Sequence, residues 1–515
     1  MATLYIAAIT AWDSVGAAEV TLYFSSGTGY ISASGDTPAN TWYEPRIIQP
    51  AFMRRDAFTN RRTSGRSSVS FGELVLANPD GELDYMADYE FDGRAILLQV
   101  GTLTKPGTPT WATVLVGKIE QATFGWNNVT IRLRDRQLEL DKTFQATKYA
   151  GTGELEGTAD DLKGRPKPRA YGRVVNVPAP LVKSSNFIYQ VNDGAVAQVE
   201  AVYDQGVVFS TRVVKANLAA LENVIPPAVG EFWDCPSLGL FRLRALPAGL
   251  VTADVLVYVS DPDEQLVGNI INSIVTGPGG ISSGDVYAQD ITDLNAGSYT
   301  AIYVGLWTGT EETTVAAQLD ILTNSIGAYW GFDTLGKFRV RQLTAPTGTA
   351  VLTLTQTEIL SIDRAASRDE SRGIPCWRVN MGWGRNYVTQ TTDLAGGTTA
   401  ARRAIIAQEF RRVTAETASI KTTHPLAVEL TRDTVMQLSG NAASEGARLL
   451  GLYGVRRDMF EVSAILPPAD MALIDINSVV AVDIDRYSMN GGRSFRVIGL
   501  MPDLRRGRID LTLWG

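Results

Sequence analysis

Alternation of apolar and polar residues dominates the first 150 positions. Turn-forming pairs such as Asp92-Gly93 and Pro106-Gly107 separate the alternating segments. These segments place apolar side chains on one face and polar side chains on the other, at 21–24, 68–71, 95–100, 113–116 and 129–134. Short strands separated by turns, with little helical periodicity, predict a small β-barrel or sandwich over residues 1–150.

The alternation resumes after a polar, proline-punctuated crossing at residues 151–168. Strand-like segments follow it at 187–191, 199–203, 241–243 and 255–259. Asn192-Asp193-Gly194 is a hairpin-type turn between two of them. We therefore expect a second, β-rich domain over residues 151–262.

Helical periodicity first appears at residues 264–275, and the run Gly277-Pro278-Gly279-Gly280 is expected to end that helix. A second helix is predicted over 313–327, where Val315, Leu319, Leu322 and Ile326 form one apolar stripe. Strand-like sequence follows it. Residues 263–345 are therefore expected to form a small α/β unit.

The remaining residues, 346–515, mix both patterns. Helices are predicted over 402–416 and 442–453, and strands over 460–466, 479–484, 495–500 and 508–514. Residues 116–120 and 129–133 are similar to residues 498–502 and 509–513, which indicates either an internal duplication or two generic hairpins. The predicted fold class is mainly β with α+β parts, and the last domain combines helices with a β-barrel.

Composition narrows the function classes. The chain has 515 residues, 45% hydrophobic and 20% charged, which excludes a disordered polymer. A formal net charge of −8 argues against generic nucleic-acid binding, which needs a basic field. No targeting segment is evident at the start, and the apolar runs are strand-sized, so we expect a soluble chain.

Candidate chemistry is scarce. The one histidine, His424, precedes Pro425 and is interpreted as a loop residue. The sequence therefore offers almost no residues from which a histidine-bearing zinc site or a Ser-His-Asp triad could be built. Cys235 and Cys376 lie far apart and are expected to be small buried residues. We expect no catalytic residue, no metal and no cofactor.

Carboxylates offer two weak alternatives. The acidic run from Asp80 to Asp92 has oxygen ligands that calcium favours, but it lacks the EF-hand spacing and is interpreted as turns and a solvated strand face. Glycoside hydrolysis needs two carboxylates held across a cleft. Its candidates cannot be paired from the sequence: Asp261, Asp263, Glu264, Asp369 and Glu370.

Two arginine clusters are the candidate contact residues. Each is interpreted as either a solvated loop or an arm that meets an acidic partner surface, since aromatic residues hardly interleave with the arginines as nucleic-acid binding would need. The clusters are Arg54, Arg55, Arg61, Arg62 and Arg66, and Arg505, Arg506 and Arg508.

Several motifs resemble tail hub proteins of long-tailed, siphovirus-type phages. Residues 71–84 (FGELVLANPDGELD) and 89–94 (YEFDGR) resemble the N-terminal barrel of these hubs, and residues 163–178 (KGRPKPRAYGRVVNVP) resemble the start of their second domain. Residues 326–333 (IGAYWGFD) are similar to the third domain. Residues 377–387 (WRVNMGWGRNY) and 495–514 are similar to the last one.

The resemblance implies an architecture and a role. Such hubs resemble the central hub of contractile tails and hubs of gene-transfer particles, with two small β-barrel domains plus two accessory domains, assembled as a homotrimer. A structural, non-enzymatic component of the virion tail baseplate, made in the host cytoplasm, is implied. The ring would adapt a sixfold tail tube to a threefold tip and let DNA pass.

The partners implied are a distal tail protein, the tape-measure protein and tail fibre or tip proteins. Sequence-specific nucleic-acid contact is not expected, and contact with the host envelope would be indirect. Two alternatives stay open: a receptor-binding tail protein, and a tail protein that degrades cell wall or polysaccharide.

Overall fold

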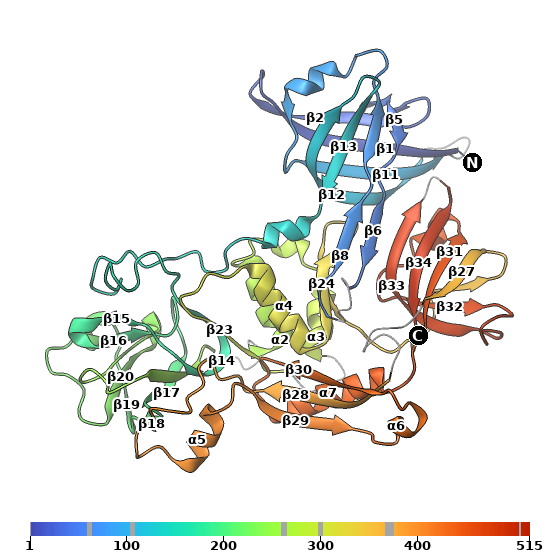
Figure 1. Cartoon of the computed structure of the whole chain (residues 1–515). Coiled ribbons are helices and arrows are strands. Elements are labelled where there is room, and N and C mark those ends of the chain that lie inside the picture. The colour runs from blue at the N-terminus through green and yellow to red at the C-terminus, as the bar shows by residue number, and fades with distance from the viewer. Residues whose placement is uncertain are drawn as a thin grey trace.

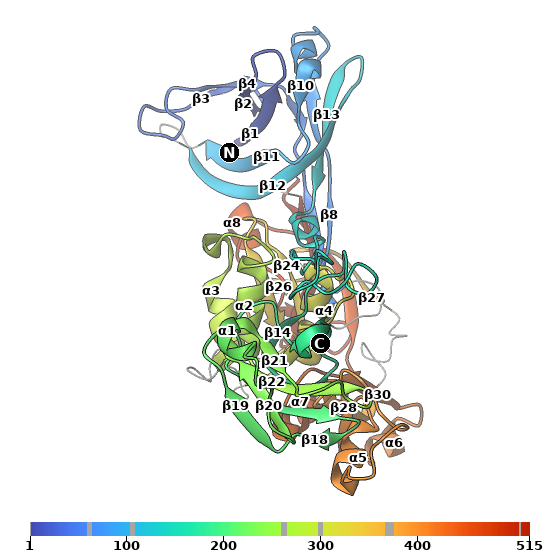
Figure 2. The ribbon, with the colours of Figure 1, turned by 90° about the vertical axis from the view of Figure 1, so that its left-hand side faces the viewer.

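The computed structural model describes residues 2–58, 64–103, 109–258, 265–296, 302–365, 375–503 and 506–515. Within these residues the chain is mainly β, with six sheets and several short helices (Figure 1). The predicted mixture of strands and helices is confirmed. Figure 2 shows that the molecule is elongated and that the N-terminal sheet stands at one end of it.

The N-terminal sheet is strongly curved around its own core. Its order is β3 (Tyr30–Ile31), β4 (Trp42–Pro45), β2 (Ala18–Ser25), β1 (Ala2–Asp13), β11 (Ala95–Leu103), β12 (Thr110–Phe124), β13 (Asn128–Arg134), β9 (Leu74–Ala77) and β5 (Ile47–Gln49). Short β10 (Tyr89–Glu90) pairs with β1. Buried Ile9, Leu74 and Ile119 belong to one cluster inside this sheet. Arg46 alone separates β4 from β5 in sequence, although β4 pairs with β2 near one end of the strand order and β5 pairs with β9 at the other end.

The C-terminal sheet has the same kind of plan. Its order is β26 (Leu352–Thr355), β32 (Val479–Asp483), β33 (Arg493–Asp503), β34 (Arg508–Trp514), β31 (Met459–Ile465) and β27 (Ile359–Ala365). Only residues 356–358 separate β26 from β27, which occupy its two ends. Among the described residues, the first and last strands of each sheet are not hydrogen-bonded to each other. The expected closed barrels are therefore not observed as closed hydrogen-bonded sheets.

A hairpin leaves the N-terminal sheet and joins the C-terminal one. Strands β6 (Met53–Asp56) and β8 (Ser68–Phe71) pair with each other, and β6 also pairs with β33. Between them, β7 (Gly65–Arg66) pairs in parallel with β24 (Ala328–Phe332). Figure 1 shows β6 and β8 extending from the N-terminal sheet toward β33 and β24. The hairpin therefore ties three parts of the chain together.

The second predicted domain contains two five-stranded sheets. One runs β18 (Val207–Val208), β17 (Gln198–Asp204), β22 (Val251–Leu256), β14 (Arg169–Val177) and β23 (Gly305–Thr308). The other runs β15 (Leu181–Lys183), β16 (Ile188–Gln190), β21 (Leu240–Arg242), β20 (Glu231–Cys235) and β19 (Thr211–Val214), beside the short helix α1 (Leu218–Leu221). Strand β23 comes from the predicted third unit, so this sheet crosses the predicted boundary at residue 262.

Helices of the third unit pack on a small sheet. Helices α2 (Val267–Thr276) and α4 (Val315–Ser325) confirm the two predicted there, and α2 ends at the predicted Gly277. Helix α3 (Ala288–Ala296) was not predicted. Strands β24 and β25 (Phe338–Gln342) form the sheet together with β7, and the core of this unit is continuous with that of the C-terminal residues.

The final predicted domain also contains a three-stranded sheet of β29 (Arg411–Glu416), β28 (Cys376–Trp383) and β30 (Val428–Asp433). Helix α7 (Ser439–Tyr453) packs on it and confirms the helix predicted over 442–453. The helix predicted over 402–416 is wrong in its second half. Helix α5 (Ala400–Ile406) ends early, and residues 411–416 form β29, because their alternating half-buried and exposed side chains suit an edge strand of this sheet. Helices α6 (Ile420–Thr423) and α8 (Pro468–Met471) are short.

Candidate interaction surfaces

Arg55, a predicted contact residue, is buried at the joint between the two curved sheets. Its side chain lies on β6, where Arg55 pairs with Leu500 of β33. Only 7% of the residue is exposed, and its Nη1 donates a hydrogen bond of 2.5 Å to Oδ1 of Asp475. The guanidinium group therefore holds the chain together internally and is not presented to a partner.

Asp475 connects Arg55 to a buried charge network. Its Oδ2 lies 3.7 Å from Nη1 of Arg339 and 3.6 Å from Nη1 of Arg341. Arg339 donates to Asp290 over 2.7 Å and to Asp333 over 3.2 Å, and Arg341 donates to Asp290 over 3.0 Å. Three arginines thus face three aspartates, so the buried charges are balanced.

Burial governs the carboxylates of this network. It raises the pKa of Asp290 to about 6, although Arg341 opposes that shift. Burial also raises the pKa of Asp333. Among the residues of this network the sequence identified Arg55 alone, and it predicted none of the contacts, because each contact joins segments far apart in the chain: Arg339 and Asp290 are 49 residues apart, and Arg55 and Asp475 are 420 apart.

Arg66 is also engaged inside the chain. Its Cζ lies 5.1 Å from the centre of the Trp330 ring, and its guanidinium pairs with the carboxylate of Asp141. Of the other predicted contact residues, Arg61, Arg62 and Arg505 lie outside the described residues.

Arg54, Arg506 and Arg508 are the predicted contact residues that face solvent. Their side chains are 49%, 77% and 43% exposed, and each pairs with an aspartate within three residues of it in sequence. The carboxylates of Glu461 and Asp510 add to the attraction on Arg54. The two arginine clusters therefore meet at one surface, although about 450 residues separate them in sequence.

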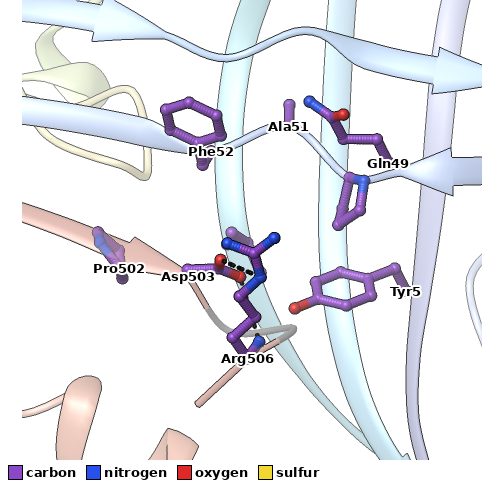
Figure 3. A pocket seen from close by; sticks show the side chains of 9 residues that line it. Tyr5, Gln49, Ala51, Phe52, Pro502, Asp503 and Arg506 are labelled. Atoms are coloured by element: carbon purple, nitrogen blue, oxygen red, sulfur yellow. Dashed lines mark hydrogen bonds and ion pairs between the residues drawn. The ribbon is translucent and has the colours of Figure 1, made fainter. Parts of the chain in front are cut away.

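A cavity of about 200 Å³ opens beside this surface. Tyr5, Val114 and the segment from Gln49 to Phe52 line it on the N-terminal side, and Pro502, Asp503 and Arg506 line it on the C-terminal side. Figure 3 shows Arg506 between Tyr5 and Asp503, with its ion pair to Asp503 drawn. The cavity belongs to the joint between the two curved sheets.

Cys235, Cys376 and His424 were considered for metal or catalytic chemistry in the sequence, and the structure shows the position of each. Cys235 and Cys376 are free and buried, as predicted. His424 follows the short helix α6, and its backbone N–H donates to the carbonyl of Ile420. Among the described residues, no group of three or more His, Cys, Asp or Glu side chains is placed to hold a metal ion. No helix in the described part of the chain is long and apolar enough to cross a membrane.

Part of the acidic run from Asp80 to Asp92 is engaged in hydrogen bonds with nearby side chains. Arg46 contacts Asp80 over 2.7 Å, and Asn78 donates to Asp84 over 2.8 Å. The hydrogen bond from Arg46 is the main reason that the pKa of Asp80 lies below its usual value. The candidate carboxylates for glycoside hydrolysis lie outside the described residues: Asp261, Asp263, Glu264, Asp369 and Glu370.

No protein-family model matches the chain, and no curated protein matches it. Among solved structures, it is similar to a tail protein from Neisseria meningitidis, with 11% identity, 92% of this chain and 94% of that chain covered, and a TM-score of 0.37. It is also similar to the 43 kDa tail protein of prophage MuSo2 from Shewanella oneidensis, with 11% identity, coverage of 92% and 96%, and a TM-score of 0.37. A protein in the virion of a native gene transfer agent has 17% identity, coverage of 68% and 84%, and a TM-score of 0.39. The chain is thus distantly similar in structure to prophage tail proteins and to a gene-transfer-agent virion protein.

Proposed function

We propose that this chain is a structural tail protein, the hub of a phage-type baseplate or tail tip. The motifs at residues 71–94, 163–178, 326–333, 377–387 and 495–514, which resemble such hubs, support this role. In this proposal three copies form a ring below the tail tube. The function is carried by surfaces, and the protein is not an enzyme.

The observation that carries the proposal is a strand plan that occurs twice. In each curved sheet two strands that are neighbours in sequence lie at opposite ends of the strand order: β26 and β27 are the two end strands of the C-terminal sheet, and in the N-terminal sheet β5 is one end strand while β4 lies next to the other, β3. The first member of each pair joins its sheet in parallel, and the second joins in the antiparallel direction. A single stretch of chain thereby brings both ends of each sheet together, as a small barrel requires.

The terminal hairpins of the two sheets carry the same irregularity. In β12 and β13, Ile119 pairs with Leu133 and Gln121 with Arg132, which leaves Glu120 as the extra residue of a bulge. In β33 and β34, Val497 pairs with Leu513 and Gly499 with Thr512, which leaves Ile498 extra. When the two hairpins are superposed on their bulges, Leu133 of β13 matches Leu513 of β34, as in the sequence comparison. For β12 and β33, however, the bulges match Ile119 with Val497, which differs by four residues from the match of residues 116–120 with 498–502 in the sequence comparison.

Two similar sheets per chain support the symmetry argument. Three copies of the chain would present six similar units, which match a sixfold tail tube, while the ring keeps threefold symmetry toward the tip. A distal tail protein, tape-measure termini and fibre or tip proteins are the proposed neighbours, and DNA would pass through the ring during ejection. Arg54, Arg506 and Arg508 are the exposed candidates for contacts with these neighbours.

Mass and symmetry test the proposal. Light scattering on the purified 55.7 kDa chain, followed by electron-microscope class averages with its tail neighbours, should give a threefold ring of three copies with six lobes. A chain that forms no ring with tail proteins would contradict the proposal. Binding to host glycan or turnover of cell-wall substrate by such a chain would support the receptor-binding or degrading alternative.

A further inference from the structure

A second cavity, of about 310 Å³, lies where the second β-rich domain meets the last part of the chain. Strands β14, β17 and β22 provide Arg173, Val175, Tyr203 and Asp254, and α5 and β29 provide Arg402, Ile405 and Arg411. Figure 1 shows α5 beside β17 and β18 at this end of the molecule. Three arginines in one cavity mark it as a place for an anion.

Arg411 is held in place but is not neutralised. Its Cζ lies 3.7 Å from the centre of the Trp383 ring. The guanidinium also occupies the space beside Gly384, where a Cβ would overlap it and where φ is +59°. Within the part of the chain that the structure describes, the side chain of Arg411 forms no hydrogen bond and no ion pair, and its Nε is buried.

Burial lowers the pKa of Arg411, and the nearby charge of Arg173 lowers it further, although the charge of Asp254 acts in the opposite direction. A like charge close to a half-buried guanidinium is unfavourable unless an anion compensates both. The arrangement therefore leaves a positive site with an unmet electrostatic demand.

The other charged groups of the cavity are mostly engaged. Arg173 donates to Glu200 over 2.7 Å. Asp254 accepts hydrogen bonds from the hydroxyl of Tyr203 over 3.0 Å and from the backbone N–H of Asn176 over 2.7 Å.

Arg402 lies over the ring of Tyr203, with its Cζ 3.6 Å from the ring centre. It donates to Asn176 Oδ1 over 2.8 Å, and its Nη1 is 3.9 Å from Asp254. Three guanidinium groups thus face two carboxylates, Asp254 and Glu200, which leaves one positive charge in excess.

We propose that this cavity binds one carboxylate, presented by an acidic side chain of a protein partner. A single negative charge matches the excess charge, whereas a phosphate dianion would add a second negative charge beside Asp254. The flat guanidinium of Arg411 suits a two-point contact with a carboxylate, and Val175 and Ile405 suit the aliphatic part of the side chain. This inference does not depend on the proposed tail function.

Calorimetric titration of the full chain at constant ionic strength tests the proposal. The probes are butyrate, inorganic phosphate, and the peptide N-acetyl-Gly-Glu-Gly-amide, with its Gln counterpart as the uncharged control. We expect saturable binding of butyrate and of the Glu peptide at one site, and binding at least about fivefold weaker for phosphate and for the Gln peptide.

Two neighbouring arginines give the matched variants. Arg411→Gln should weaken binding of butyrate and of the Glu peptide about tenfold or more. Arg412→Gln should leave binding within about twofold, because Arg412 is exposed and pairs with Asp433. Should Arg411→Gln fail to fold, Arg411→Lys keeps the charge but not the planar group, and it should weaken binding about threefold or more.

Four results would overturn the proposal. The first is the lack of saturable butyrate binding, and the second is equal binding by the wild type and the folded Arg411 variant. The third is phosphate binding as tight as butyrate binding, and the fourth is butyrate binding without binding of the Glu peptide. Either of these last two removes the carboxylate of a protein segment as the ligand.

Discussion

Arg55 and Asp475 are 420 residues apart in sequence, and a hydrogen bond of 2.5 Å joins them. Arg55 belongs to the hairpin that leaves the N-terminal sheet, and Asp475 lies in the loop before β32. The contact adds to the pairing of β6 with β33 and to the charge network around Arg339. The relative position of the two curved sheets therefore depends on this joint.

Arg55→Met should destabilise the protein measurably. The change removes a buried charged donor and leaves Asp475 with its longer contacts to Arg339 and Arg341, so we expect the free energy of unfolding to fall by about 1–3 kcal/mol. Arg54→Met is the matched control, since Arg54 is half exposed and pairs locally with Asp56; it should cost about 0.5 kcal/mol or less. Urea unfolding measures both, and equal losses would contradict the role of Arg55.

Gly305→Ala should disrupt the sheet that crosses from the second domain to the third unit. Gly305 pairs with Gly172 of β14, and a Cβ at Gly305 would overlap the backbone carbonyl oxygen of Arg173. Backbone cannot move aside as a flexible side chain can, so we expect a loss of about 2–3 kcal/mol in the free energy of unfolding.

The control for this variant is Gly117→Ala, also in a strand, where a new Cβ would lie 3.8 Å from its nearest neighbours. That substitution should change stability by about 0.5 kcal/mol or less. Thermal unfolding of the two variants side by side separates a general effect of strand glycines from the close approach at Gly305. A similar loss for both would reject the steric explanation.

Much of the secondary structure follows from local pattern, and the exceptions have physical causes. The apolar stripe of Val315, Leu319 and Leu322 is fully buried in α4, as its spacing predicts. Helix α3 has only Ile291 and Leu294 as buried apolar residues, so its stripe is too short to stand out in the sequence. The strand at Arg411–Glu416 exists because β28 lies beside it, and that neighbour cannot be read from the local sequence.

The candidate surface was only partly predictable for a related reason. Sequence identified Arg54, Arg55, Arg66, Arg506 and Arg508 as a class, because clustered arginines near turns stand out. It could not separate Arg55, which is buried, from Arg54, which is exposed, because strand pairing with β33 decides which side chain faces inward. The positive cavity around Arg411 was missed because its three arginines are spread over 238 positions between Arg173 and Arg411.

Acid should remove the stabilisation that Asp458 provides. Arg493 donates to this carboxylate over 2.9 Å, Arg364 also donates to it, and the backbone of Asp458 exchanges two hydrogen bonds with Gly515 at the end of the chain. Burial acts against the charged form, but the bonds from Arg493 and Arg364 prevail and hold the pKa of Asp458 below its usual value.

Because the unfolded chain takes up the proton more readily, the charged Asp458 stabilises the fold above about pH 4, the ordinary value for aspartate, and this contribution is lost as pH falls through the lower folded pKa. Asp458→Asn should therefore cost about 1 kcal/mol at pH 7, and this cost should shrink steadily as the pH falls below about 4. Urea unfolding at pH 7 and at a series of pH values below about 4 measures this, and a pH-independent difference would contradict it.

Weakening an exposed apolar pair should impair assembly if the proposed ring forms. Ile31 and Trp42 pair directly across β3 and β4, at the periphery of the N-terminal sheet in Figure 2, and they are 63% and 50% exposed. An exposed apolar pair at a sheet edge is typical of an interface.

The double variant Ile31→Thr, Trp42→Thr should lower the trimer fraction about tenfold at fixed concentration, measured by light scattering, with an unchanged monomer fold by circular dichroism. Leu426→Thr, on an 80% exposed residue after α6, should leave the mass unchanged. If the double variant still forms the trimer, this edge is not a contact of the ring. The ring itself is tested separately by the mass and symmetry measurements on the wild type.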